Sequence, residues 1–216
     1  MEGLGRVLVN TARCRVAVFA SGRGSNFRAL AERCQDAAFS CVVACLVTDD
    51  PSAPAISVAR DFQIPVHVID AGPRRGRLRP GAEADIVRHC RDEDVHLIVL
   101  AGFMRILEGD VLDAFTGRVM NIHPSLLPSF KGLSAQRQAF EYGVKIAGCT
   151  VHFVDASLDG GPIILQSAIA VHDNDDAEIL RERILVEEHR ILARAADLFA
   201  RGRLRIEERR VLGTED

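Results

Sequence analysis

The chain has 216 residues, of which 48% are hydrophobic and 26% charged, and its 27 Lys+Arg against 30 Asp+Glu give a formal net charge of −3 at pH 7. That length suits one sizeable α/β domain, and the balanced charge argues against a dedicated binder of nucleic acid or of a membrane surface. The longest apolar runs, such as residues 97–104, are too short to cross a bilayer, and the N-terminus lacks a signal-peptide pattern. We therefore expect a soluble, cytoplasmic protein.

Strand and helix signals alternate through the first half of the chain, which predicts an α/β fold with a mostly parallel, twisted sheet flanked by helices. Strands are predicted at residues 15–20, 41–48, 65–69 and 96–101, with helices at 26–34, at 55–62 and ending near 91. The last of these strands is continuously apolar, which is typical of a central strand covered on both faces. This half is expected to be Rossmann-like.

The second half begins with a short helix and a strand and then changes character, because two neighbouring strands joined through an Asp-Gly-Gly-Pro sequence predict a hairpin or near-hairpin. The predicted elements are a helix at 111–115, strands at 118–123, 149–155, 163–171 and 204–206, and a helix at 134–142. Asp175 or Asp176 can cap a long amphipathic helix that runs to about residue 201 and is closed by Gly202.

A glycine turn, residues 22–26 (GRGSN), lies between the first predicted strand and helix. Its glycines allow close approach of a ligand to the backbone, and the helix N-terminus favours phosphate. A dinucleotide fingerprint is incomplete, because Phe27 occupies the position of its third glycine and only Asp49 and Asp50 are candidates for a ribose diol. A monophosphate fits better, and the alternative is a tight turn with a structural role only.

Asn121 and His123 lie two residues apart at the end of the strand predicted at 118–123. In a strand their side chains leave the same face while Ile122 points the other way. Such a donor pair, fixed before a proline-stiffened loop, suits stabilisation of a developing oxyanion. Asp159, in the sequence LDGGP, would favour the protonated form of His123 if the two meet. Alternatively, Asn121 and His123 merely cap a strand, and Asp159 is a turn residue without a partner.

The segment 102–107 (GFMRIL) leaves the predicted central strand at its carboxyl end, where open α/β sheets bind ligands. Gly102 lets the chain turn closely. The apolar side chains that follow could line a flat slot for a ring system, or they could belong to an ordinary core.

Other chemistry is not indicated. The six cysteines form no CxxC pair, so we expect reduced, mostly buried thiols, and the histidines lack metal-ligand spacing, so we expect no catalytic metal. No GxSxG motif is present and covalent catalysis is not expected. His152, on an alternating strand, is expected to be structural, and the arginines at 74–79 to lie mostly in a solvated loop.

Together these motifs resemble the phosphoribosylglycinamide formyltransferases, the folate-dependent formyltransferase family of purine synthesis. The resemblance covers residues 14–206 and rests on SGRGSN, LAGFMRIL, NIHPSLLPSFKG, GCTVHFVDASLDGGPIILQ and VEEH, in that order. It implies a single formyltransferase domain with a phosphate- and nucleotide-binding half at 14–115 and a catalytic and folate-binding half at 116–206. Residues 1–13 would then be an extension and 207–216 a tail.

The resemblance implies transfer of a formyl group from 10-formyltetrahydrofolate, as co-substrate, to the amine of 5'-phosphoribosylglycinamide. It implies a monomer or homodimer that uses no metal, nucleic acid or membrane. The residues matching the catalytic positions are Asn121, His123 and Asp159. Those matching the phosphate and ribonucleotide contacts are Gly24, Ser25, Asn26 and Glu188. Those matching the folate contacts are Arg79, Met104, Arg105, Ile106, Leu107, Asn121, Asp155 and Asp159.

The chain departs from the family pattern at Lys131, where many members have proline, and at Ser134 and Gln136, where some have histidine. Arg79 matches the folate-side arginine by spacing, with Arg77 as the alternative.

Other functions remain alternatives. Methionyl-tRNA formyltransferases share the Asn-x-His-Pro and Asp elements but need a further C-terminal domain and a basic face. Formyltetrahydrofolate deformylases usually carry an N-terminal regulatory domain, and a sugar-nucleotide formyltransferase fits the glycine turn less well. A nucleotide-binding module without catalysis would use the same turn and sheet, but would not need Asn121, His123 and Asp159 together.

Overall fold

The computed structural model describes residues 13–73 and 76–215. Nearly all of the expected N-terminal extension, and the first two arginines of the 74–79 cluster, lie outside the described residues. Within the described ranges, none of the helices combines the length and the apolar character needed to cross a membrane.

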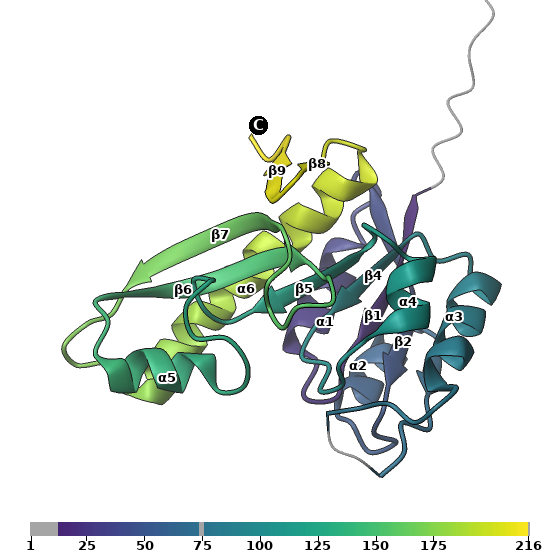
Figure 1. Cartoon of the computed structure of the whole chain (residues 1–216), viewed down its shortest axis with the longest axis horizontal. Coiled ribbons are helices and arrows are strands. Elements are labelled where there is room, and N and C mark those ends of the chain that lie inside the picture. The colour runs from purple at the N-terminus through teal and green to yellow at the C-terminus, as the bar shows by residue number, and fades with distance from the viewer. Residues whose placement is uncertain (1–12, 74–75, 216) are drawn as a thin grey trace, which may run out of the picture.

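One sheet of nine strands runs through the described part of the chain in the order β3-β2-β1-β4-β5-β6-β7-β9-β8 (Figure 1). The strands are β1 (Cys14–Phe19), β2 (Cys41–Thr48), β3 (Val66–Val68), β4 (Leu97–Leu100), β5 (Val119–His123), β6 (Ile146–Phe153), β7 (Ile163–Ala170), β8 (Arg205–Glu207) and β9 (Arg210–Leu212). The first five are parallel to one another, whereas β6 is antiparallel to both β5 and β7. The predicted α/β class with a mostly parallel sheet, and the predicted near-hairpin, are confirmed.

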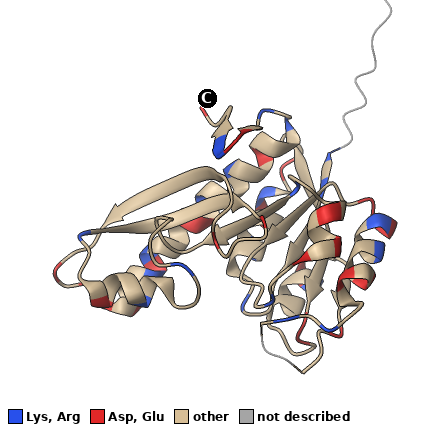
Figure 2. Ribbon diagram, in the orientation of Figure 1, with Lys and Arg blue, Asp and Glu red and all other residues tan. Residues whose placement is uncertain are grey.

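Helices cover both faces of the sheet. They are α1 (Ser25–Arg33), α2 (Ala55–Asp61), α3 (Ala82–Asp92), α4 (Gly109–Ala114), α5 (Ala135–Tyr142) and α6 (Ala177–Ala200). Along β1, Val16 and Val18 join a core with α1, α2 and α6, while Ala17 and Phe19 join a second core with α3 and α4. A strand buried on both sides needs apolar residues at every position, which explains the continuous apolar runs. Charged side chains lie mainly on helices and loops (Figure 2).

The long helix α6 begins where its cap dictates. The side chain of Asp176 accepts hydrogen bonds from the backbone N–H groups of Glu178 and Ile179, so Asp176 is the cap of the two predicted alternatives. Asp175 instead forms an ion pair with Arg183.

The structure differs from the prediction at two strands. β6 begins at Ile146, three residues before the predicted start at 149, because Gly148 weakened the strand signal. A Cβ at Gly148 would lie 1.9 Å from the carbonyl oxygen of Ser167, so the close pairing of β6 with β7 requires that glycine. The stretch 207–216, expected to be a tail, contains β9, which pairs with β7 and β8. Its three residues are too few to give a pattern.

The order of strands determines where the site lies. From β1 the chain continues to β2 on one side, and β4 lies on the other, so the strand order reverses between β1 and β4. In such sheets ligands bind outside the carboxyl ends of the strands at that point. There the turn after β1 meets the segment after β4, through a hydrogen bond of 3.1 Å from the Ser21 N–H to the Gly102 carbonyl oxygen.

Candidate active site

The end of β5 presents Asn121 and His123 on one face of the sheet. Ile122, between them, packs into the core on the opposite face with α6, as the alternation predicts. The neighbouring strand β6 places His152 directly opposite Asn121 in the antiparallel register.

His123 is 5% exposed and both of its ring nitrogens face acceptors. Nε2 lies 2.9 Å from the carbonyl oxygen of Phe130, and Nδ1 lies 3.4 Å from Oδ2 of Asp159. A carbonyl oxygen only accepts, so Nε2 donates to it. A ring protonated on both nitrogens would satisfy both contacts, and the predicted meeting of His123 with Asp159 is present in the structure.

Asp159 lies in a tightly turned loop with a φ of 45°. Its Oδ2 accepts a hydrogen bond of 2.8 Å from the Gly132 N–H, so one short segment, 130–132, contacts both His123 and Asp159. The next two residues must be small. A Cβ placed on Gly160 would lie 2.2 Å from Ser157 Oγ, and a Cβ placed on Gly161 would lie 1.9 Å from the Phe153 carbonyl oxygen. These contacts explain the Asp-Gly-Gly sequence.

His152 lies beside Asn121 and Asp159, although its place on an alternating strand predicts a structural role. Its Nδ1 donates to the Phe153 carbonyl oxygen at 2.8 Å, so its Nε2 carries a lone pair when the ring is neutral. That Nε2 lies 3.2 Å from Nδ2 of Asn121 and 3.9 Å from Oδ1 of Asp159. Burial lowers the pKa of His152 below its usual value, which favours the neutral ring. The Asn121 amide group therefore donates to His152, which fixes its orientation.

The glycine turn after β1 ends in α1, whose N-cap is Gly24 with a φ of 75°. A Cβ at Gly24 would lie 2.9 Å from that of Ala55, so both the backbone conformation and the space demand glycine. Among the described residues no side chain caps this helix end, which leaves backbone N–H groups from Ser25 onward for an anion.

Asn26 and Glu188 meet in the interior beside this turn. Nδ2 of Asn26 donates to Oε2 of Glu188 at 2.6 Å, and the two residues are only 9% and 5% exposed. Burial raises the pKa of Glu188 above its usual value. Oδ1 of Asn26 is buried without a hydrogen-bond partner among the described residues.

The segment after β4 is only partly core. Met104 and Ile106 are 54% and 48% exposed, whereas Leu107 is 4% exposed and Phe103 packs edge-on against Phe19 at 5.4 Å. Two apolar side chains thus remain accessible at the carboxyl end of the sheet. The side chain of Arg105 is 15% exposed and pairs with Asp49, so the Asp49 carboxylate is already engaged.

Arg77 and Arg79 line a shared cavity of about 260 Å³ with Ile106. Arg79 also forms ion pairs with Asp85 and Asp70, which raise its pKa. Of the predicted folate residues, Asp155 stands apart: its carboxylate accepts a hydrogen bond from the Ser157 N–H at 2.8 Å and stabilises its own loop.

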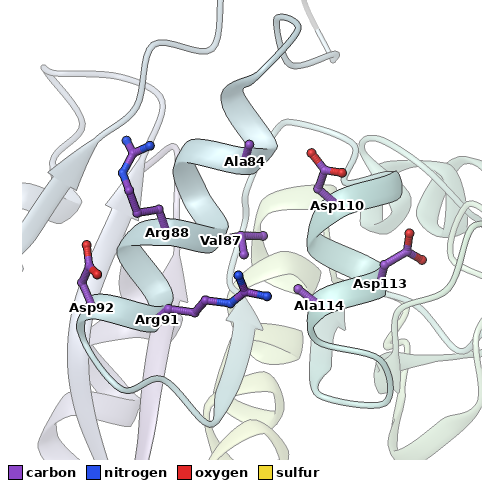
Figure 3. A pocket seen from close by; sticks show the side chains of 8 residues that line it. All are labelled: Ala84, Val87, Arg88, Arg91, Asp92, Asp110, Asp113 and Ala114. Carbon is purple, nitrogen blue, oxygen red and sulfur yellow. The ribbon is translucent and has the colours of Figure 1, made fainter.

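A larger groove of about 660 Å³ lies between α3 and α4 (Figure 3). Arg88 and Arg91 come from α3, Asp110 and Asp113 from α4, and Arg91 reaches toward Ala114. None of the residues predicted for the site lines this groove, so it is not part of the candidate active site.

All six cysteines are free and buried. Burial raises the pKa of Cys45, Cys90 and Cys149 to about 12, which keeps them as thiols at neutral pH. Within the described ranges, no group of three or more His, Cys, Asp or Glu side chains is arranged to hold a metal ion.

Residues 14–196 match the formyl transferase family. The chain belongs to this family. It is 43% identical over 176 residues to phosphoribosylglycinamide formyltransferase of Bacillus subtilis, a match that covers 82% of this chain and 89% of that protein. It is also 38% identical over 196 residues to the human trifunctional purine biosynthetic protein adenosine-3. That match covers 91% of this chain and 19% of the human protein.

Solved structures of the family agree with the fold. Glycinamide ribonucleotide transformylase 1 of Symbiobacterium toebii superposes with a TM-score of 0.89 and 43% identity over the whole of both chains. A formyltetrahydrofolate deformylase of Pseudomonas syringae superposes with a TM-score of 0.86 at 28% identity, covering 94% of this chain and 67% of that one.

Proposed function

We propose that the chain is a phosphoribosylglycinamide formyltransferase of purine biosynthesis. It transfers the formyl group of 10-formyltetrahydrofolate to the amine of 5'-phosphoribosylglycinamide, which yields formylglycinamide ribonucleotide and tetrahydrofolate. The observation that carries this proposal is the cluster of Asn121, His123 and Asp159 in a chain 43% identical to an enzyme of that name.

The cluster has the groups that formyl transfer requires. The neutral amine attacks the formyl carbon and forms a tetrahedral adduct whose oxygen becomes negative. The second Nδ2 hydrogen of Asn121 can donate to that oxygen, because the first is held by His152. Donation from His123 Nε2 would replace its hydrogen bond to the Phe130 carbonyl oxygen. Asp159 supports the positive ring and helps to move the proton from the attacking to the leaving nitrogen.

We assign the two substrates to the two segments that meet where the strand order reverses, the turn after β1 and the segment after β4. We assign the ribonucleotide phosphate to Gly24, Ser25 and the other free N–H groups of the glycine turn. A ribose hydroxyl would find acceptors in Glu188 and in Oδ1 of Asn26, which has no other partner among the described residues.

We assign the folate to the accessible apolar surface of Met104 and Ile106, with Arg105 and Leu107 as the flanking backbone. Arg79, with Arg77, would bind the carboxylates of its glutamate tail from the cavity that they share with Ile106. Asp155 contributes by shaping the loop that carries Asp159.

On this proposal, residues 14–115 form the nucleotide-binding half and 116–206 the catalytic and folate-binding half. The enzyme works in the cytoplasm, as a monomer or homodimer, on small-molecule substrates alone.

The test is release of tetrahydrofolate from 10-formyltetrahydrofolate with 5'-phosphoribosylglycinamide present and then omitted. Product formed only with the ribonucleotide supports the proposal. Equal product without it would replace the proposal with a deformylase, the activity named for the Pseudomonas syringae relative. His123→Ala should lower kcat by about 100- to 1,000-fold, the usual loss when one oxyanion donor is removed. Asp159→Asn should lower kcat by about 100- to 10,000-fold, because it removes the group that moves the proton. The far-ultraviolet circular dichroism should stay unchanged in both variants.

A further inference from the structure

An ion pair joins the end of β2 to the segment after β4. Nε of Arg105 lies 2.6 Å from Oδ2 of Asp49, and the two side chains are 15% and 7% exposed. The other carboxylate oxygen of Asp49 accepts a hydrogen bond from the hydroxyl of Ser21, at the end of β1. Ser21 Oγ in turn accepts from the Met104 N–H at 2.9 Å. One carboxylate therefore holds both the backbone of Met104 and the side chain of Arg105.

The same arginine continues the network outward. Its Nη1 donates to the Arg77 carbonyl oxygen at 3.1 Å, and the Ile106 N–H donates to the Gly76 carbonyl oxygen at 2.9 Å. Gly76 and Arg105 form a parallel β-bridge. The loop that carries Arg77 and Arg79 is thus attached to the segment that Asp49 holds.

The chemistry of this contact requires a carboxylate. Asp49 receives hydrogen from two donors at once, the Ser21 hydroxyl and the Arg105 guanidinium, one on each oxygen. An asparagine could satisfy only one of them, because its amide nitrogen would face the other donor. Removing one partner of a buried, hydrogen-bonded charge pair leaves the other charge uncompensated, so the freed arginine would move toward solvent.

We propose that Asp49 is a positioning residue for the folate side of the site. Through Ser21 and Arg105, Asp49 fixes the position of residues 104–107, the surface on which the bicyclic heterocycle of the folate lies. Asp49 itself does not contact the folate. The inference rests on the proposed function, because it takes residues 104–107 as the folate surface.

The test compares Asp49→Asn and Asp49→Ala with Asp50→Asn in the full chain. Asp50 is the matched control, because, among the residues that the structure describes, its carboxylate accepts hydrogen bonds from Ser52 alone, within its own turn. Both Asp49 variants should raise the KM for 10-formyltetrahydrofolate by about 10- to 100-fold, because the folate then binds a surface that is no longer held in its bound form. The KM for the ribonucleotide and kcat at saturation should stay within about twofold, and Asp50→Asn should change none of these values.

Binding of tetrahydrofolate, measured by titration calorimetry, gives a readout without turnover and should weaken by the same factor in the Asp49 variants. Asp49→Ala combined with Arg105→Ala should weaken binding by less than the product of the two single losses, because the two changes share the Asp49–Arg105 contact. If Asp49→Ala does not fold, the folate KM and the binding of tetrahydrofolate are measured on Asp49→Asn and Ser21→Ala instead.

Unchanged folate KM and binding in folded Asp49 variants, or an equal rise in KM for both substrates, would overturn the inference and leave the proposed function standing. Absence of formyl transfer by the unmodified chain would overturn the proposed function, and the binding measurement would then decide the inference alone.

Discussion

The side-chain amide of Asn121 lies 3.2 Å from Nε2 of His152, its partner across the β5–β6 pair. Because the other ring nitrogen donates to the Phe153 carbonyl oxygen, a neutral His152 can only accept here. The amide nitrogen of Asn121 is therefore turned toward His152. A proton on Nε2 would confront that amide with a second donor.

Removal of His152 should consequently disturb the orientation of Asn121. We expect His152→Ala to lower kcat by about 100-fold, as misplacement of a reacting group by 1 Å does, with a smaller effect on either KM. His152→Gln should recover part of the loss, because its amide oxygen can accept from Asn121. Steady-state kinetics test this, with His172→Ala, an exposed histidine outside the cluster, as control. An unchanged kcat in His152→Ala would refute the role.

Acidification should destabilise the fold. Burial lowers the pKa of both His152 and His189 from the ordinary value of 6.5. Below pH 6.5 the unfolded chain therefore binds protons that these folded residues do not, so their contribution to the free energy of unfolding falls until the pH has passed their folded pKa values. Thermal melts at decreasing pH should show this decline, and His189→Gln should make it shallower. Equal declines in both proteins would count against the prediction for His189.

Glu188→Gln should separate stability from substrate binding. Burial raises the pKa of Glu188, so above the folded pKa the native state must hold a charged carboxylate that is better solvated when unfolded. The amide variant removes that penalty and can still accept from Asn26. We expect a higher Tm at neutral pH, an advantage that shrinks on acidification as Glu188 takes up its proton, and a raised KM for the ribonucleotide.

Glu187→Gln is the control for that comparison. Hydrogen bonds from Ser167 and Arg190 lower the pKa of Glu187, so its charge is favoured in the folded state and its loss should leave the neutral-pH Tm unchanged or lower. A Tm that rises in Glu187→Gln as much as in Glu188→Gln would show that charge removal on α6 is stabilising in general.

Two glycines of the glycine turn should differ sharply in their tolerance of substitution by alanine. Gly24→Ala forces a Cβ to 2.9 Å from that of Ala55 at a φ of 75°, whereas a Cβ at Gly22 meets nothing within 4 Å. A non-glycine residue held in a sparsely populated backbone conformation costs about 1–3 kcal/mol, which lowers the Tm of a chain of this size by several degrees. Differential scanning calorimetry should detect this loss in Gly24→Ala and not in Gly22→Ala; a smaller loss in Gly24→Ala would mean that α2 moves away.

The sequence predicted what depends on local pattern. Alternation places Asn121 and His123 on one face of β5 with Ile122 in the core, and the glycine turn before α1 follows from spacing alone. His152 could not be assigned in that way, because its proximity to Asn121 depends on the register of an antiparallel pair, which no single strand encodes. The contact of Asp49 with Arg105 joins residues 56 positions apart, through loops whose paths are set by the sheet.

The segment from Phe130 to Gly132 contacts the candidate catalytic residues through main-chain atoms: a carbonyl oxygen for His123 and an N–H for Asp159. Phe130 and Gly132 have positive φ values of 53° and 79°, which constrains the residue type at these two positions, whereas Lys131 between them supplies neither group. The side chain of Lys131 donates to the Leu158 carbonyl oxygen at 3.1 Å, immediately before Asp159 in the chain. Substitution of Lys131 would therefore remove a side-chain contact to the loop of Asp159 while leaving both main-chain contacts of residues 130 and 132 in place.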